Sequence, residues 1–271
     1  MTKIAIMSDI HSNTEALNVV LAKCLELGIK EYAILGDIVG YNAEPAECIA
    51  SVRSLNVIGR VRGNHDEYAG NVENGIEGFN ENAQRAVLWT AEHLSDDDKK
   101  YLMAAPYRVN LPKYSMTLVH ATLDSPEAWG YIFDEHHAAD NFTYQFTQLC
   151  FCGHSHVPVG FCKKPVAMQS AKQIEEITTW TDAVVPGGDA RDFTIFDSVT
   201  VELQTGHKYL LNVGSIGQPR NKDPRASFAV YDSNDKSVTR YRVPYDIAAT
   251  QAKIREVGLP ERLAERLASG T

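Results

Sequence analysis

The sequence has no long apolar run. A membrane-spanning helix needs about 20 consecutive apolar residues, and no stretch of the chain approaches that length. The first residues, 1–8, enter a strand-like run directly and show none of the charged segment, apolar segment and cleavage site of a secretory signal peptide. We therefore expect a protein without membrane partners that is located in the cytoplasm.

Cysteine is also scarce. The 5 cysteines are an odd number without regular spacing, which argues against a framework of disulfides and agrees with a reducing compartment. Two of them, Cys150 and Cys152, alternate along a strand-like run next to Gly153-His154. Alternate residues of a buried strand are typically inert thiols, so we interpret this pair as core residues rather than as zinc ligands.

Positive charge is in deficit. Lys and Arg together number 26 against 35 Asp and Glu, which gives a formal net charge of −9. A surface that binds nucleic acid or an anionic membrane needs a basic patch. Stable binding of nucleic acid is therefore not expected.

The rest of the composition is that of a globular protein. With 271 residues, 44% of them hydrophobic and 23% charged, the chain is long enough to bury a substantial core without disulfides. It contains no internal repeat, low-complexity tract or linker, so we expect a single domain over residues 1–271. Residues 163–192 are the least regular part of the sequence and fit either an ordered insert or a mobile flap.

The N-terminal part alternates between strand-like and helix-like segments. Residues 3–7 are a short apolar run, and residues 14–27 place apolar side chains at the spacing of an amphipathic helix. Residues 31–35 and 57–61 repeat the strand pattern, with a helix expected at 45–52 between them. This alternation predicts βαβ units and a largely parallel sheet.

The C-terminal half contains more strand. Further helices are expected at 80–94, 95–104, 135–146, 246–257 and 260–268. Further strands are expected at 115–119, 149–152, 157–162, 193–203, 208–213, 226–231 and 237–243. The fold class is therefore α/β.

Five strand-like segments end in residues that bind metals or transfer protons. These residues are Asp9 with His11, Asp37, Asn64 with His65, His120, and His154 with His156. The carboxyl ends of the strands in an open α/β sheet face one crevice, so we expect these side chains to converge there. Ordinary turns are the alternative, but turns do not require histidine.

Without His65, the set offers two carboxylates, one amide oxygen and four imidazoles. Seven ligands are too many for one tetrahedral zinc ion, but they suit two divalent cations about 3.5 to 4 Å apart that share a carboxylate. Imidazole and oxygen ligands without a thiolate favour Mn, Fe, Zn, Co or Ni over Ca or Mg. The sequence therefore predicts two divalent metal ions as cofactors.

Five short motifs carry these residues in a fixed order. They are Asp9-Ile10-His11, Gly36-Asp37, Gly63-Asn64-His65-Asp66, His120 and Gly153-His154-Ser155-His156. In this order they resemble the motif set of the calcineurin-like metallophosphoesterases, over residues 9–156. A later stretch, Asn212 to Arg220 with Asp223 to Arg225, resembles a C-terminal signature of a bacterial branch of the same family.

The resemblance implies a fold and a role for each residue. The fold would be a four-layer α/β/β/α sandwich of two mixed sheets. One metal would be held by Asp9, His11, Asp37 and His156, and the other by Asp37, Asn64, His120 and His154, with Asp37 bridging. His65 would donate a proton to the leaving-group oxygen and Asp66 would orient it, while Asn64 and His65 would also contact the substrate.

Such a site would hydrolyse phosphomonoesters or phosphodiesters by in-line attack of a hydroxide held between the two cations. The substrate would be a small phosphorylated molecule, such as a nucleotide, or a phosphoprotein. A dinucleoside polyphosphate hydrolase is an alternative, and a non-catalytic metal-binding scaffold is an alternative of a different class. A scaffold would be expected to lack a ligand or His65, and the sequence lacks none of them.

Two further features lie close to the motifs in sequence. Arg220 follows a glycine-rich turn, where its guanidinium could bind a phosphate with two hydrogen bonds; a solvated loop arginine is the alternative. Trp129, Tyr131 and Phe133 come shortly after His120. They could form an aromatic wall for a base or another ring, with core packing as the alternative.

Overall fold

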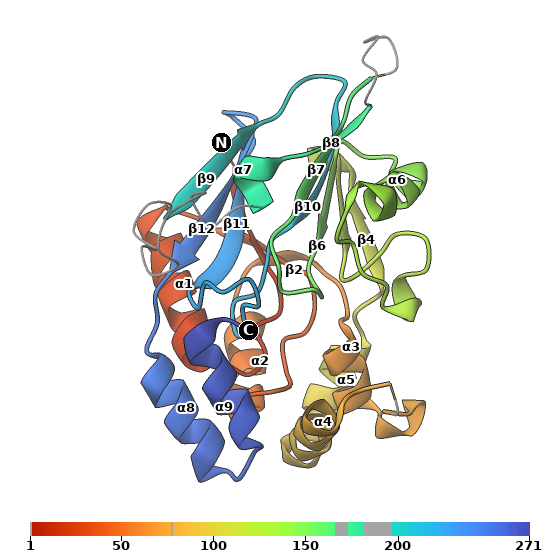
Figure 1. Cartoon of the computed structure of the whole chain (residues 1–271). Coiled ribbons are helices and arrows are strands. Elements are labelled where there is room, and N and C mark those ends of the chain that lie inside the picture. Colours follow the sequence, from red (N-terminus) through yellow and green to blue (C-terminus); the bar gives the residue numbers. More distant parts are fainter. Residues whose placement is uncertain (1, 77, 166–172, 182–196) are drawn as a thin grey trace.

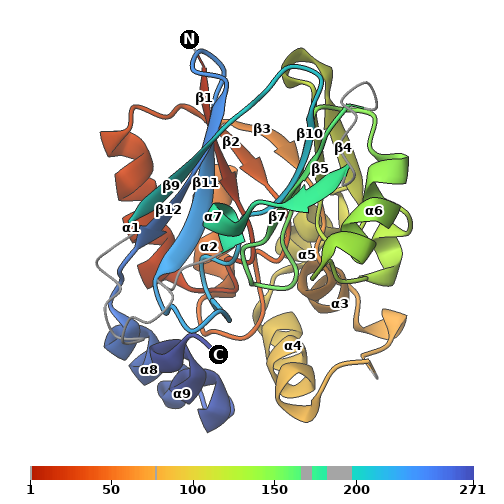
Figure 2. The same cartoon turned by 45° about the horizontal axis from the view of Figure 1, so that its top comes forward.

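The chain folds into two β-sheets that face each other, with helices on their outer faces and at one end (Figures 1 and 2). A computed structural model describes residues 2–76, 78–165, 173–181 and 197–271. Both views place the N-terminus at one end of the sandwich and the C-terminus toward the other. Among the described residues, no helix has the length and apolar character to cross a membrane.

The elements follow one another as strands and helices in mixed order. The strands are β1 (Lys3–Met7), β2 (Glu31–Ile34), β3 (Val57–Arg60), β4 (Arg108–Leu111), β5 (Met116–Val119), β6 (Leu149–Cys152), β7 (Gly160–Lys163), β8 (Ile174–Glu176), β9 (Ser198–Glu202), β10 (Lys208–Asn212), β11 (Ala226–Asp232) and β12 (Ser237–Val243). The helices are α1 (Thr14–Glu26), α2 (Pro45–Arg53), α3 (Asn64–Gly70), α4 (Glu81–His93), α5 (Asp96–Met103), α6 (Glu135–Tyr144), α7 (Thr178–Thr181), α8 (Ile247–Glu256) and α9 (Glu261–Ser269).

Both sheets are mixed. The first has the strand order β3-β2-β1-β11-β12-β9, in which β1, β2 and β3 are parallel and the remaining pairs antiparallel. The second has the order β4-β5-β6-β10-β7-β8, in which β5, β6 and β10 are parallel and both edges antiparallel. Two six-stranded mixed sheets agree with the fold that the resemblance implies. The parallel pairing expected from the alternation of strands and helices is confirmed for β1, β2 and β3, but the whole sheet is not largely parallel, because hairpins such as β11–β12 add antiparallel neighbours.

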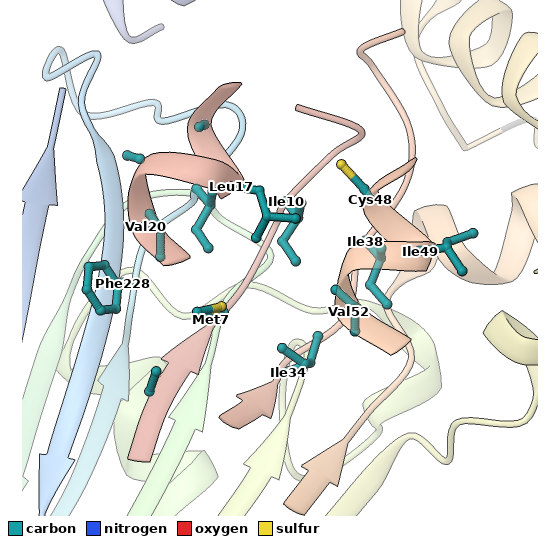
Figure 3. Close-up of a cluster of buried hydrophobic side chains, with 14 of the residues drawn as sticks. Met7, Ile10, Leu17, Val20, Ile34, Ile38, Cys48, Ile49, Val52 and Phe228 are labelled. Atoms are coloured by element: carbon teal, nitrogen blue, oxygen red, sulfur yellow. The ribbon is translucent and has the colours of Figure 1, made fainter. Parts of the chain in front are cut away.

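The outer face of the first sheet is covered by α1 and α2. Leu17 and Val20 of α1 and Ile49 and Val52 of α2 are buried in one apolar cluster, which includes Phe228 of β11 (Figure 3). The helix predicted at 14–27 is thus amphipathic as expected, with its apolar stripe against the sheet.

The space between the two sheets is filled from both of them. Successive residues of a strand point to opposite faces, so Ile4 and Ile6 of β1 face the second sheet, where they pack with Leu118 and Phe151. Helix α6 covers the outer face of the second sheet through Phe142. The order of the layers is therefore helix, sheet, sheet, helix.

The cysteines are core residues. Cys150 and Cys152 of β6 are buried in the apolar cluster under α6. Burial raises the pKa of the Cys150 thiol to about 12, so the thiol is neutral. All five cysteines are free, which agrees with their interpretation from the sequence.

Helices α3, α4, α5, α8 and α9 gather at the end of the sandwich away from the N-terminus (Figures 1 and 2). Helices α8 and α9 form a hairpin, and its apolar side chains, including Ile254 and Leu263, pack against α4 and against Tyr41. Beyond α9 the chain closes on the loop that follows β10. There the backbone N–H of Lys222 donates to the carbonyl of Gly270 at 2.8 Å.

Several elements differ from the expectation. Residues 64–70 form helix α3, although their polar composition also fits a turn. The short elements β4, β8 and α7 were not indicated by the sequence pattern. Residues 166–172 and 182–196 lie outside the described residues, and with them most of the segment 163–192 and the start of the strand expected at 193–203.

Trp180 anchors the described part of the segment 163–192. Its side chain is fully buried in the cluster between the sheets. The indole Nε1 donates to the carbonyl of Asn212 at 2.8 Å. The ring also lies against Gly160, where an added Cβ would be 3.0 Å from the indole. Residues 173–181 are thereby packed into the core.

We expect Trp180→Ala to lower the free energy of unfolding by about 3 to 5 kcal/mol, because it leaves a cavity and an unpaired carbonyl in the core. Urea unfolding followed by circular dichroism measures this loss. Leu25→Ala is the control, since Leu25 is 79% exposed and its loss should change stability by less than about 0.5 kcal/mol. Equal stability of the two variants would contradict an anchoring role.

Candidate metal centre

The seven candidate ligands all follow strands whose carboxyl ends lie at the same end of the sandwich. In the first sheet, Asp9, Asp37 and Asn64 come after the parallel strands β1, β2 and β3. In the second, His120 and His154 come after the parallel strands β5 and β6. The two remaining ligands are His11 and His156. All seven side chains are at most 7% exposed. The two sheets thus contribute to one buried site.

The backbone is strained at most of these positions. Positive φ angles occur at Asp9 (53°), His11 (48°), Asp37 (53°), His154 (65°) and His156 (60°). Residues other than glycine seldom adopt this left-handed conformation, and each instance costs on the order of 1 kcal/mol or more. The surrounding structure must therefore hold these loops in place, and the strained turns aim the side chains inward.

The first set of facing ligand atoms comes from Asp9, His11, Asp37 and His156, whose ligand atoms lie within 4.8 Å of one another. His11 Nε2 is 3.1 Å from His156 Nε2 and 3.7 Å from Asp9 Oδ1. It is also 3.6 Å from Asp37 Oδ2, and His156 Nε2 is 3.3 Å from Asp9 Oδ1. These atoms point toward a common centre.

The second set lies next to the first and shares Asp37 with it. His120 Nε2 is 3.4 Å from Asp37 Oδ2 and 3.3 Å from Asn64 Oδ1. His154 Nδ1 is 3.1 Å from the same Asn64 oxygen. Asp37 Oδ2 is therefore the atom that faces both sets.

Each of the four imidazoles uses its other ring nitrogen for a backbone carbonyl. The pairs are His11 Nδ1 with Val39 O (2.9 Å), His120 Nδ1 with Leu35 O (2.7 Å), His156 Nδ1 with Gln218 O (2.7 Å) and His154 Nε2 with Trp129 O (2.9 Å). A carbonyl only accepts hydrogen bonds, so this nitrogen carries the proton. In the neutral ring, the nitrogen that faces the centre is then free to bind a metal.

Asp37 and His120 each shift the pKa of the other. Burial by itself raises the pKa of Asp37, but the imidazoles of His120, His65 and His11 and the hydrogen bond with His120 lower it well below its usual range. Burial lowers the pKa of His120, yet the carboxylates of Asp37 and Asp9 outweigh burial and raise it to about 9. A positive charge is thus strongly favoured at this point of the site.

The residues present fit divalent cations. Asp9 Oδ1 is fully buried and has no hydrogen-bond partner in the described part of the chain, although ring nitrogens of His11 and His156 face it. A buried acceptor without a donor is costly, and a cation removes that cost. The separations of 3.1 to 3.7 Å match the roughly 3.4 Å between ligands of a tetrahedral ion with bonds of about 2.1 Å.

The sequence model for the calcineurin-like phosphoesterase superfamily domain matches residues 2–236, most of the chain. The chain belongs to this superfamily. The matched region contains all five motifs and all seven buried side chains of the two sets. The resemblance inferred from the motifs is thereby confirmed.

Relatives of this calcineurin-like phosphoesterase cover it from end to end. An uncharacterised protein of Methanocaldococcus jannaschii is 36% identical over 270 residues, which are 98% of each chain. The crystal structure of a metallophosphoesterase from Sphaerobacter thermophilus is similar with a TM-score of 0.79 and 36% identity, and covers 100% of this chain and 99% of its own. A hypothetical protein from Pyrococcus horikoshii shares the fold, with a TM-score of 0.74, 20% identity and coverage of 100% and 99%. Family and structure together support metal-dependent hydrolysis of a phosphoester.

His65 lies beside the two sets of ligands. Its ring centre is 4.8 Å from that of His11, 4.3 Å from that of Tyr41 and 4.8 Å from that of Phe79. Its backbone N–H donates to Asp37 Oδ1 at 2.8 Å. The ring nitrogen Nδ1 is buried, and none of the residues that the structure describes forms a hydrogen bond with it. Burial lowers the pKa of His65 well below its usual value, so the ring is neutral near pH 7 in the protein alone.

The carboxylate of Asp66 is held by the backbone, and its expected role in orienting His65 stays a prediction. Among the described residues, its carboxylate accepts hydrogen bonds from the backbone N–H groups of Ile38 (2.8 Å), Val39 (3.3 Å) and Gly63 (3.3 Å). The reason is the helix α3, which places Asp66 in its first turn with the carboxylate toward the loop after β2. Burial raises the pKa of Asp66 to about 6. Asp66 therefore fastens this loop to the start of α3.

Arg220 lies at the edge of the site. Its guanidinium carbon is 5.4 Å from the ring centre of Tyr41, and one terminal nitrogen donates to Gln218 Oε1 at 2.8 Å. Its Nε is buried without a hydrogen-bond partner, and Arg220 forms no salt bridge within the described parts of the chain. The positive charge of Arg220 adds to burial in lowering the pKa values of His65 and His156.

Two residues at the site were not identified from the sequence. Tyr41 packs its ring 4.6 Å from His11 and has a φ of 61°. Gln218 holds His156 through its carbonyl and Arg220 through its side chain. An aromatic residue directly after Gly40, in the loop that starts with Gly36-Asp37, is the signal that could have indicated Tyr41. For Gln218 the signal is its place in the stretch Asn212 to Arg220.

Gly63 allows the loops after β2 and β3 to approach each other closely. An added Cβ at Gly63 would lie 2.0 Å from Asp37 Oδ1 and 2.5 Å from the Asp37 backbone nitrogen. We expect Gly63→Ala to displace this carboxylate and to weaken Mn²⁺ binding about 10- to 100-fold. Equilibrium titration of metal-depleted protein with Mn²⁺ measures the affinity. Gly78→Ala is the matched control, because an added Cβ there has no atom within 4 Å; equal affinities of the two variants would refute the expectation.

Proposed function

We propose that this chain is a dinuclear metal-dependent hydrolase of phosphomonoesters or phosphodiesters. The observation that carries the proposal is the position of Asp37 Oδ2, which is 3.6 Å from His11 Nε2 and 3.4 Å from His120 Nε2. One oxygen faces both sets of ligands, as a carboxylate shared between two cations does. Membership of the calcineurin-like phosphoesterase superfamily supports the reaction.

The seven buried side chains would hold the two cations in two groups. The first group is Asp9, His11, Asp37 and His156, and the second is Asp37, Asn64, His120 and His154. When bound, divalent cations supply the positive charge that activates water and neutralises phosphoryl oxygens. The mixture of imidazole and oxygen ligands supports Mn, Fe, Zn, Co or Ni at these positions.

His65 would transfer a proton to the leaving-group oxygen. Its Nδ1 faces Gly40, where an added Cβ would be only 2.5 Å away, so only Nε2 is free to meet a substrate. The ring is neutral in the protein alone, and a negatively charged phosphoester close to it favours the protonated form. Asp66 would contribute indirectly, because it fastens the loop after β2 to the helix that begins at Asn64.

Asn64 and Arg220 would contact the phosphoryl group. Asn64 turns its Oδ1 toward His120 and His154, which leaves its amide N–H groups to donate to a phosphoryl oxygen. Arg220 has a guanidinium without a carboxylate partner among the described residues and an unpaired Nε. A phosphate oxygen is a suitable acceptor for it.

The substrate would be a small phosphorylated molecule, such as a nucleotide, or a phosphoprotein. The residues of the two sets act on the phosphoryl group that these substrates share, and they do not distinguish the rest of the molecule. The cytoplasmic location expected from the sequence stays a prediction.

The proposal predicts hydrolysis of a chromogenic phosphomonoester or phosphodiester that depends on a divalent metal. We expect the metal-depleted protein to be inactive and added Mn²⁺ to restore release of p-nitrophenol from p-nitrophenyl phosphate, from bis(p-nitrophenyl) phosphate or from both. The absence of turnover of either ester, with each of the five metals named above, would favour the non-catalytic scaffold.

The role of His65 predicts that the effect of its removal depends on the leaving group. We expect His65→Ala to keep metal affinity and to lower kcat about 10²- to 10⁴-fold for esters with a poor leaving group. The loss should be smaller for p-nitrophenyl esters, because a good leaving group needs no proton. His136→Ala, at an exposed position, is the control. An equal loss for all leaving groups would argue against proton donation by His65.

A further inference from the structure

A stack of aromatic rings leads outward from the metal centre. The ring of Tyr131 stacks on that of His154, with centres 4.4 Å apart and planes at 28°. The ring of Phe133 stacks on Tyr131 in turn, with centres 5.2 Å apart and planes at 8°. We refer to His154, Tyr131 and Phe133 as the aromatic stack. It connects a candidate metal ligand to the protein surface.

The outer members of the aromatic stack are exposed. Tyr131 is 45% and Phe133 56% exposed, although both are large aromatic side chains. Core packing does not account for such exposure, since packing buries aromatic rings. Two parallel rings at the surface instead offer a flat face on which a further planar ring can stack.

The same two rings line a pocket. Its volume is about 420 Å³ and its lining includes Tyr131, Phe133, Asp124, His137 and Asp140. Pockets that bind small molecules have volumes of roughly 300 to 1,000 Å³, with apolar walls and a few polar groups. The pocket is therefore of a size for part of a small ligand, and Tyr131 places it next to His154.

The loop that carries the stack is held in position. The carbonyl of Trp129 accepts a hydrogen bond from His154 Nε2 at 2.9 Å, and Trp129 has a positive φ of 55°. The rings of His137 and Phe133 lie perpendicular to each other, with centres 6.4 Å apart and planes at 89°. His137 is held in turn by Asp134, because its ring nitrogen Nδ1 lies 2.6 Å from Asp134 Oδ1. The stack is thus preorganised, which lowers the entropic cost of binding.

Charged groups of both signs lie near the aromatic stack. The pocket beside the stack carries the carboxylates of Asp124 and Asp140, which repel phosphate but can accept hydrogen bonds from the amino group of a base. A positive charge is supplied by Arg220, which lies next to Tyr41 and close enough to Tyr131 to oppose the rise that burial causes in the pKa of that phenol. A ligand with an anionic end and a planar amino-bearing ring would therefore place its phosphate on the side of Arg220 and its ring on the stack.

We propose that the pocket beside Tyr131 and Phe133 is a nucleobase subsite, and that the substrate is a nucleotide whose base stacks on these rings. The proposal rests on the proposed phosphoesterase function for the position of the phosphate. It adds to that function the class of the substrate and two residues that determine specificity. Neither residue contacts the phosphoryl group in this arrangement.

The test compares two ligands that differ only in the base. Adenosine 5′-monophosphate and ribose 5-phosphate share the phosphate and the sugar, so the difference in their affinities isolates the base. Binding to the Mn²⁺-loaded protein is measured by isothermal titration calorimetry. We expect the wild-type protein to prefer the nucleotide by about tenfold or more, the size of one base–aromatic stacking contact.

The variants then locate the contact. Phe133→Ala should weaken nucleotide binding about tenfold and leave ribose 5-phosphate unchanged, and Tyr131→Phe should retain the preference because it keeps the ring. The matched control is Phe146→Ala. Phe146 is 82% exposed but precedes β6 at its amino end, whereas His154 follows its carboxyl end, so both affinities should stay unchanged.

The outcomes separate this proposal from the proposed function. Equal affinities for the two ligands, or an equal effect of Phe133→Ala on both, would overturn the nucleobase subsite even if p-nitrophenyl esters are hydrolysed. Conversely, a base preference that depends on Phe133 would support the subsite even if no ester is turned over. In that case only the hydrolytic function would fail.

Discussion

The site depends on the close approach of two loops at one carboxylate. An added Cβ at Gly36 would lie 2.4 Å from the nitrogen of Gly63, and one at Gly63 would lie 2.0 Å from Asp37 Oδ1. Only glycine tolerates such contacts. Because the loops come this near, Asp37 accepts the backbone N–H of His65 with one oxygen and faces His11 and His120 with the other. Both sets of ligands, and the ring beside them, are positioned relative to this side chain.

The two sheets support the strained loops around Asp37. The backbone N–H of His11 donates to the carbonyl of Asp37 at 3.0 Å, and that of Gly153 to the carbonyl of His120 at 2.9 Å. Each bond joins loops that follow neighbouring strands. The left-handed backbone conformations at the ligands persist because buried strands on both sides fix the ends of the loops. The mixed sandwich therefore provides the rigidity that a preformed metal site requires.

Much of this arrangement could be predicted from the sequence, because strands that end in ligand residues have a physical signature. Apolar runs followed by Asp9, Asp37 or His154 place the ligand at the strand end without knowledge of the fold. The antiparallel pairs of both sheets could not be predicted, since a strand pattern does not specify its partner. The hydrogen bonds of the Asp66 carboxylate could not be predicted either, because its direction depends on helix α3. Tyr41 packs in one apolar cluster with residues such as Leu263, more than 200 positions away, and local sequence does not predict such a contact.

The hydrogen bond between Lys222 and Gly270 has a consequence for biosynthesis. It closes the loop that follows Arg220, and Gly270 fits so tightly that an added Cβ would be 2.8 Å from the carbonyl carbon of Asp223. Nascent domains fold from their N-terminal part while synthesis continues at about 5 to 20 residues per second. The strands that present Asp9 and Asp37 can thus pair early, whereas the Arg220 loop reaches its final contacts only after residue 270 has left the ribosome. Maturation of the site therefore depends on a residue about 50 positions beyond Arg220.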